Sequence, residues 1–212
     1  MTLTLPRRLL PLLISLMLLL GLAEPGHADA GRFLTSPSTS ELQAEISSLS
    51  TAAASLSPER QQRLEDLNRL ATAIAASDDR AQLENASIHS IGVFLRYKKD
   101  RSGSPVALSL LGPGQQSDDD FDLLGIYVPA EVALQWGAGG APASPGPRVA
   151  RVLEGEVLRI TDATTATGAA AYSLNLPVFA LLEADSAQAI TSSLPTFSQA
   201  DLDAQSPTAP AD

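Results

Sequence analysis

The segment IHSIGVFLRY, residues 88–97, decides the fold, because here a helical pattern of apolar residues gives way to a strand pattern. Every second side chain falls on one predicted face, which comprises His89, Ile91, Val93, Leu95 and Tyr97. Alternation of this kind is typical of a strand that buries one face. These residues are therefore predicted to form the first strand of a β-rich domain that extends over residues 88–183.

Downstream of this strand, the sequence predicts further strands separated by segments rich in glycine, proline and serine. They are expected at residues 106–111, 121–128, 148–154, 156–161 and 172–182, with a short helix over 129–136 and a loop over 137–147. A hairpin turn is expected at Gly155, and Pro177 indicates a sheet edge or a bulge in the last strand. About six strands in this length favour a mainly antiparallel sheet or a small barrel.

Upstream of the strand, residues 40–87 are predicted to form an amphipathic helical pair. The first helix is expected to begin at Ser40 with a capping box to Gln43, and the second after Ser57 with Pro58 at its first position. The apolar face comprises Leu42, Ile46, Leu49, Ala53 and Leu56 in the first helix and Leu64, Leu67, Leu70, Ala71 and Ile74 in the second.

The second helix is expected to turn a charged face to solvent, with Arg60, Arg63, Glu65, Asp66 and Arg69. The pair is either one kinked helix or a hairpin, with the hairpin favoured, and a short third helix through Leu83 is a further alternative. Helices that precede a run of strands indicate an α+β fold.

Residues 1–30 are expected to be an export signal. Arg7 and Arg8 precede an apolar run over 9–23, and Ala28 and Ala30 supply the small residues that a signal peptidase accepts. The run is short for a membrane span, which needs about 20 apolar residues, so no stable span is expected once the signal is cleaved. If the signal is retained, the run becomes an anchor.

The expected location is the periplasm, an equivalent lumen or the outside of the cell. Residues 31–39 are predicted to be a linker, and residues 184–212 a disordered tail with few large apolar side chains. Within that tail, Leu194 to Phe197 are a candidate docking point.

The composition excludes several classes of function. The chain has no cysteine, and loss of the leader removes His27 and leaves His89 as the sole histidine. Zinc and other transition metals need several histidine or cysteine ligands, and a serine–histidine–acid triad would have to use His89. The leader holds two acidic and two basic residues, so the formal net charge stays at −10, which disfavours nucleic acid. We therefore expect no catalytic residue, no cofactor and no nucleic-acid partner.

Two charged clusters are the candidate sites. The first lies at a predicted hairpin tip and comprises Arg96, Tyr97, Lys98, Lys99 and Arg101. It is either a contact for an acidic partner or anionic headgroups, or a solvated turn that discourages edge pairing. The second is an acidic loop with Asp118, Asp119, Asp120 and Asp122, which is either a weak calcium site or a solvated loop. His89 is expected to cap the edge of the core.

These observations favour an exported, non-catalytic binding or accessory protein of the cell envelope, with a protein or another envelope component as its partner. Two alternatives remain. One is a hydrolase that uses carboxylates alone, and the other is a weak calcium-binding module at the acidic loop.

Overall fold

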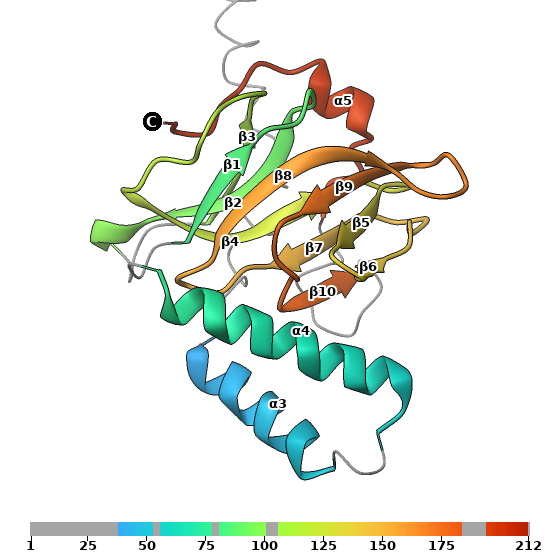
Figure 1. Cartoon of the computed structure of the whole chain (residues 1–212). Coiled ribbons are helices and arrows are strands. Elements are labelled where there is room, and N and C mark those ends of the chain that lie inside the picture. The colour runs from blue at the N-terminus through green and yellow to red at the C-terminus, as the bar shows by residue number, and fades with distance from the viewer. Residues whose placement is uncertain (1–37, 53–55, 78–80, 101–105, 184–193, 212) are drawn as a thin grey trace, which may run out of the picture.

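The chain is an α+β protein in which a helical hairpin lies at one end of two packed β-sheets (Figure 1). The computed structural model describes residues 38–52, 56–77, 81–100, 106–183 and 194–211, and these are the described residues below. Each sheet has five strands and neither closes into a barrel. The predicted α+β class and mainly antiparallel pairing are confirmed, whereas the small barrel does not form.

The first helix, α3 (Thr39–Thr51), begins one residue earlier than predicted. Its capping box joins Ser38 to Glu41, not Ser40 to Gln43. The carboxylate of Glu41 accepts a hydrogen bond from the amide of Ser38 at 2.7 Å. An ionised acceptor forms a stronger hydrogen bond than an amide and is favoured at the positive end of a helix, so the cap moves to the glutamate.

The second helix, α4 (Pro58–Ala75), begins as predicted and packs beside α3 as a hairpin. Two of its charged side chains face the protein, contrary to the prediction of a solvent-facing side. Arg63 Nε lies 2.9 Å from Glu45 Oε1, and Arg63 also donates to the carbonyl of Phe179 at 2.6 Å. Asp66 accepts a hydrogen bond from Trp136 Nε1 at 3.0 Å. These contacts fasten the hairpin to the sheets.

The antiparallel sheet has the strand order β10-β7-β4-β2-β3. Its strands are β2 (Ile91–Tyr97), β3 (Ala107–Leu111), β4 (Phe121–Val128), β7 (Arg148–Arg151) and β10 (Ala180–Glu183). The register between β2 and β4 shifts between Phe94 and Leu95, where Leu124 forms a bulge. A bulge changes which face later residues occupy, so Leu123 before it and Ile126 after it both lie in the main core, although they are three residues apart.

The mixed sheet has the order β1-β8-β9-β5-β6. Its strands are β1 (Gln82–Asn85), β5 (Ala133–Trp136), β6 (Gly139–Ala141), β8 (Val157–Thr164) and β9 (Ala170–Leu174). β1 runs parallel to β8, and β5 runs parallel to β9. The third helix proposed through Leu83 is therefore wrong, because Leu83 belongs to strand β1.

Three other local predictions differ from the structure. Residues 133–136 form a strand and not part of a helix, because they pair with β9 on one side and β6 on the other. The predicted hairpin at Gly155 does not form, because β7 and β8 belong to different sheets. Gly155 instead turns with φ +97°, which takes the chain from one sheet to the other. The predicted last strand is likewise divided into β9 and β10, in different sheets.

Apolar side chains form three clusters. The main core draws on both sheets, with residues such as Val93, Leu95, Ile126, Leu158, Ile160 and Leu174. A second cluster occupies the outer face of the antiparallel sheet and includes Phe94, Leu124, Tyr127, Val149, Leu194 and Leu202. A third joins the helical hairpin to the sheets through Leu67, Leu70, Leu153 and Phe179. The antiparallel sheet is therefore buried on both faces.

Residues 194–211, the C-terminal strap below, cover the second cluster and include the short helix α5 (Gln199–Asp203). Leu202 is fully buried, and the hydroxyl of Tyr127 donates to the carbonyl of Pro195 at 2.5 Å. Further along, the amide of Ala209 donates to the carbonyl of Leu110 in β3 at 2.8 Å. The order of residues 194–211 differs from the predicted disordered tail, of which residues 184–193 and 212 lie outside the described residues. Leu194 and Phe197, the expected docking point, pack in the second cluster. None of the helices within the described residues is long and apolar enough to span a membrane.

Candidate functional site

The two predicted charged sites lie against each other. Because β2 and β4 are antiparallel, Arg96 is opposite Asp122 and Tyr97 is opposite Phe121. Arg96 Nη2 lies 3.2 Å from Asp122 Oδ2, and both side chains are largely buried. The sequence prediction treated these residues as parts of separate sites, but the pairing of the strands makes them one ion pair.

The two lysines after β2 also contact the acidic loop. Lys98 Nζ donates to the carbonyl oxygen of Asp119 at 2.7 Å, and Lys99 Nζ lies 3.5 Å from Asp120 Oδ1. The hydrogen bond to Tyr97, followed by the charge of Asp120, raises the pKa of the Lys99 ammonium. The basic cluster is thus partly neutralised within the molecule. Arg101 lies outside the described residues.

The acidic loop does not gather its carboxylates around one point. Asp118 Oδ1 accepts a hydrogen bond from the amide of Asp120 at 2.7 Å, while Asp120 and Asp122 face Lys99 and Arg96. Calcium requires six to eight oxygen ligands that converge. Throughout the described part of the chain, no group of three or more histidine, cysteine, aspartate or glutamate side chains is arranged to hold a metal ion.

A different site forms around His89, which lies in the segment between β1 and β2. Asn85, fully buried, fixes this segment. Its Nδ2 donates to the carbonyl oxygens of Leu111 and Gly112, each at 2.9 Å, and to that of His89 at 2.8 Å. Its Oδ1 accepts a hydrogen bond from Ser87 Oγ at 2.7 Å. The backbone that carries the imidazole is therefore rigidly held.

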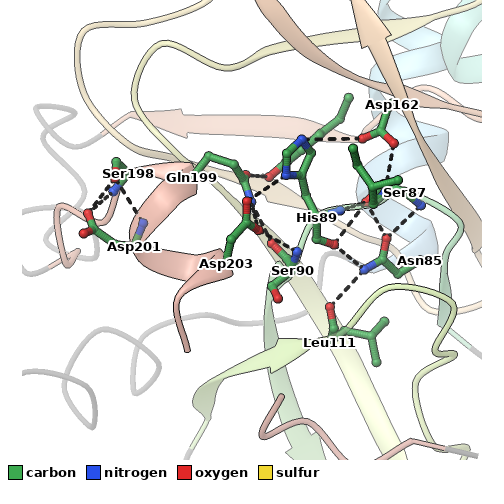
Figure 2. Close-up of polar contacts among 12 residues, drawn as sticks. Asn85, Ser87, His89, Ser90, Leu111, Asp162, Ser198, Gln199, Asp201 and Asp203 are labelled. Carbon is green, nitrogen blue, oxygen red and sulfur yellow. Dashed lines mark hydrogen bonds and ion pairs between the residues drawn. The ribbon is translucent and has the colours of Figure 1, made fainter. Parts of the chain in front are cut away.

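Asp203 of the strap orients the imidazole (Figure 2). Its Oδ2 lies 2.7 Å from His89 Nδ1, and its Oδ1 accepts from the amide of Ser90 at 2.9 Å and from Gln199 Nε2 at 2.9 Å. Burial alone would raise the pKa of Asp203, but the hydrogen bonds from Ser90, Gln199 and His89 together outweigh it and lower that pKa. Asp203 is therefore ionised at neutral pH.

Asp162 of β8 lies on the other side of the imidazole (Figure 2). Its Oδ1 is 3.9 Å from His89 Nε2, and its Oδ2 accepts a hydrogen bond from the amide of Ile88 at 2.9 Å. The His89 and Asp162 side chains are 35% and 39% exposed, so solvent and ligands reach both. The imidazole thus stands between two carboxylates from two distant elements.

A hollow of about 330 Å³ opens beside these groups, and we call it the His89 hollow. Its lining residues are Ile88, His89, Asp162, Ala163, Thr164, Gly168, Ala170, Ala171, Tyr172 and Gln199. Ile88 is the most exposed large apolar side chain among the described residues, at 78%. Burial, and then the charges of Asp203 and Asp162, raise the pKa of Tyr172. The hollow therefore combines an aliphatic wall with a negative field.

A larger hollow of about 620 Å³ lies beside the end of α4, between Ala73, Ser77, Val157 and Leu176. None of the described side chains that line it is ionisable. It could enclose a ligand but has no charged group to orient one, so the His89 hollow is the better candidate despite its smaller volume.

The chemistry of the site is limited by what contacts the imidazole. The Asp203–His89 pair resembles the acid and base of a hydrolytic triad. The contact with Asp203 directs Nε2 toward Asp162, and no hydroxyl or thiol among the described residues is hydrogen-bonded to that nitrogen. The arrangement can hold a proton or accept a hydrogen bond, but no described nucleophile is positioned on Nε2.

Sequence reasoning missed most of this site. His89 was placed at the edge of the core, and its status as the sole histidine outside the predicted leader was the available signal. Asp203 is 114 residues away and lies in the segment predicted to be disordered. The predicted cleavage residues Ala28 and Ala30 lie outside the described residues. No protein-family model, curated protein or solved structure matches the chain.

Proposed function

We propose that this protein is an exported, non-catalytic binding protein of the cell envelope, and that the His89 hollow is its recognition site. Export rests on the leader pattern of residues 1–30. The observation that carries the binding role is the exposed Ile88 beside Asp162 and the imidazole that Asp203 orients, in a hollow where no described hydroxyl or thiol is hydrogen-bonded to His89 Nε2. A concave apolar surface with a few oriented polar groups is the usual form of a binding site.

This proposal places the partner-binding site at the His89 hollow and not at the basic cluster at the end of β2, where the sequence predicted it. Arg96, Lys98 and Lys99 each contact the acidic loop, so binding an acidic partner there would have to break internal contacts. At the His89 hollow, by contrast, the side chain of Ile88 is mostly exposed to water, so a partner can contact it without breaking an internal contact.

The test compares two exposed apolar residues of the same molecule. Ile88→Ser alters the wall of the His89 hollow, and Val157→Ser alters the other exposed large hydrophobe, which is 47% exposed and lies outside that hollow. Each variant is crosslinked to its surroundings in the envelope, recovered, and its partners are identified by mass spectrometry. Loss of a partner in Ile88→Ser alone supports the proposal, and equal recovery from both variants contradicts it.

A hydrolase is the second candidate, and the Asp203–His89 pair is the observation that favours it. General-base catalysis by an oriented imidazole contributes 10²–10⁴-fold to a rate. Hydrolysis of an ester panel that falls by about this factor in His89→Gln would replace the binding proposal, whereas no measurable turnover leaves the binding role in place.

A further inference from the structure

The imidazole of His89 has a defined hydrogen on the side of Asp203. An ionised carboxylate only accepts hydrogen bonds, so the 2.7 Å contact between Asp203 Oδ2 and His89 Nδ1 requires a hydrogen on Nδ1. Asp203 itself is held by Ser90 and Gln199. The neutral imidazole therefore presents the lone pair of Nε2 to the other side.

On that other side, the lone pair meets a second acceptor. Asp162 Oδ1 lies 3.9 Å from Nε2, and Oδ2 of the same carboxylate is already hydrogen-bonded to the amide of Ile88. Two acceptors that face each other need a donor between them. The donor is a proton on Nε2, a water molecule or a group from a ligand.

The spacing of the two acceptors suits one nitrogen with several hydrogens. A nitrogen about 2.8 Å from each atom would make two charge-assisted hydrogen bonds at an angle of about 90°. A guanidinium fits less well, because its planar fork pairs with both oxygens of a carboxylate and Asp162 Oδ2 is engaged. A bare metal ion lacks ligands, since the described residues supply no group of three.

The remainder of the hollow indicates an alkyl chain on that nitrogen. Ile88, Ala163, Ala170 and Ala171 provide an aliphatic lining, and the volume of about 330 Å³ is at the lower end for ligand sites. Among the described residues, Asp162 on β8 and Asp203 on α5 face His89, and Tyr172 on β9 lines the same hollow. The two carboxylates make the field negative, which attracts a cation.

We infer that the His89 hollow binds a primary alkylammonium group, which bridges His89 Nε2 and Asp162 Oδ1. This inference rests on the proposed binding function and names its ligand chemistry. The group belongs either to a lysine side chain of a protein partner or to a small free amine. In both cases the ammonium competes with the proton for the same position on Nε2.

The test is an NMR titration of the full chain with n-butylammonium at millimolar concentration. The amide signals of Ile88, Thr164 and Gly168 are expected to shift at pH 7.5. Tetramethylammonium, which has the charge but no N–H, is expected not to bind. Equal shifts with both cations would overturn the inference.

Three variants separate the hydrogen bonds from general charge attraction. Asp162→Asn replaces the charged acceptor that faces His89 Nε2 with a neutral amide. Asp203→Asn removes the carboxylate that keeps the hydrogen on His89 Nδ1. Each variant is expected to bind butylammonium about tenfold more weakly. Glu84→Gln removes an exposed carboxylate of the same sheet and is expected to change nothing. Circular dichroism confirms that each variant folds. Unchanged affinity in either folded aspartate variant contradicts the inference.

A lysine-containing peptide and the same peptide with an acetylated lysine distinguish the two sources. Tighter binding of the unmodified peptide than of butylammonium assigns the site to a protein lysine, and the reverse assigns it to a free amine. If no ammonium binds but Ile88→Ser still loses its crosslinked partner, the ligand inference fails and the proposed function stands. If ammonium binds and the partner is unaffected by Ile88→Ser, the inference stands and the proposed partner surface fails.

Discussion

At the scale of single residues, Glu156 is a carboxyl in the interior. It lies in the turn between β7 and β8 and is fully buried. Its Oε2 accepts a hydrogen bond from the amide of Leu153 at 2.5 Å, while Oε1 has no hydrogen-bond partner within the described residues. Burial raises the pKa of Glu156 to about 8, and the bond from Leu153 offsets this only in part. The side chain is therefore mainly protonated at neutral pH.

This carboxyl makes stability depend on pH. A group whose pKa is raised by folding stabilises the fold fully below its unfolded pKa, near 4.5, and that contribution is lost as the pH rises to about 8. The wild-type free energy of unfolding is expected to fall by several kcal/mol over this window, at about 1.4 kcal/mol per pKa unit. Glu156→Gln is expected to flatten the curve and to be more stable than wild type at pH 8.

Urea denaturation at half-unit pH intervals measures this effect. Glu84→Gln is the control, because the side chain of Glu84 is 46% exposed. A wild-type curve that is level between pH 5 and 8 would show that Glu156 titrates normally.

At the scale of elements, α4 is attached to the mixed sheet through Asp66 and Trp136. The carboxylate of Asp66 is 6% exposed, and the indole of Trp136 and Gln62 Nε2 donate to it at 3.0 and 3.1 Å. The hydrogen bond joins positions 70 residues apart, so it closes the hairpin onto β5. A buried carboxylate of this kind is costly when it loses a donor.

Trp136→Phe is expected to destabilise the protein by about 1–3 kcal/mol, because Asp66 loses its indole donor while staying buried. Asp66→Ala combined with Trp136→Phe is expected to cost less than the two single changes together. Chemical denaturation of the four proteins measures the coupling free energy. Simple additivity within about 0.3 kcal/mol would show that the hydrogen bond contributes nothing to stability.

Local sequence patterns predict correctly those elements that are determined by residues close together in the sequence. Pro58 after Ser57 starts α4, and the alternation of residues 91–97 forms β2. Residues 133–136 were predicted as part of a helix because Pro129 suits the first position of a helix and Gly137 suits its end. Their pairing with β9, over 30 residues away, overrides these local signals and buries Leu134 and Trp136 in the main core. No local pattern contains this information.

At the scale of the whole molecule, the C-terminal strap decides whether the antiparallel sheet is buried on one face or two. Leu202 is fully buried in the second cluster, and Asp203 joins the strap to His89 and Ser90. The sequence around these residues is rich in small and polar residues, which is why it was predicted to be disordered. Its order comes from contacts with β2, β3 and β4, and the candidate site shares this dependence.

Leu202→Ala is expected to cost about 2–5 kcal/mol, since it leaves a cavity in the second cluster. We expect the loss to appear first as local detachment of the strap, because residues 194–211 are held along one side of the sheet. Hydrogen exchange should therefore accelerate at Ala209, which bonds to Leu110, before it does in β8. Equal acceleration in both segments would show that the strap unfolds only with the whole molecule.

Acid is expected to release the same segment. The pKa of Asp203 lies below its ordinary value of 3.8, so its hydrogen bonds stabilise the strap above that pH and are lost as the pH falls through the folded pKa. The NMR signal of the Ser90 amide should move as Asp203 protonates. In Asp203→Asn this movement should be absent, and its persistence would assign the change to another group.

The strap has a further consequence for the order of events during synthesis. Strand β3 lies at the edge of the antiparallel sheet, and the amide of Leu110 donates to Thr208 Oγ1, 98 residues later, so part of this edge is covered by the strap. A polypeptide made from its N-terminus leaves that edge uncovered until the strap has been synthesised. Contacts between such distant segments also slow folding. Synthesis of the strap therefore sets the earliest moment at which the edge of β3 can be covered.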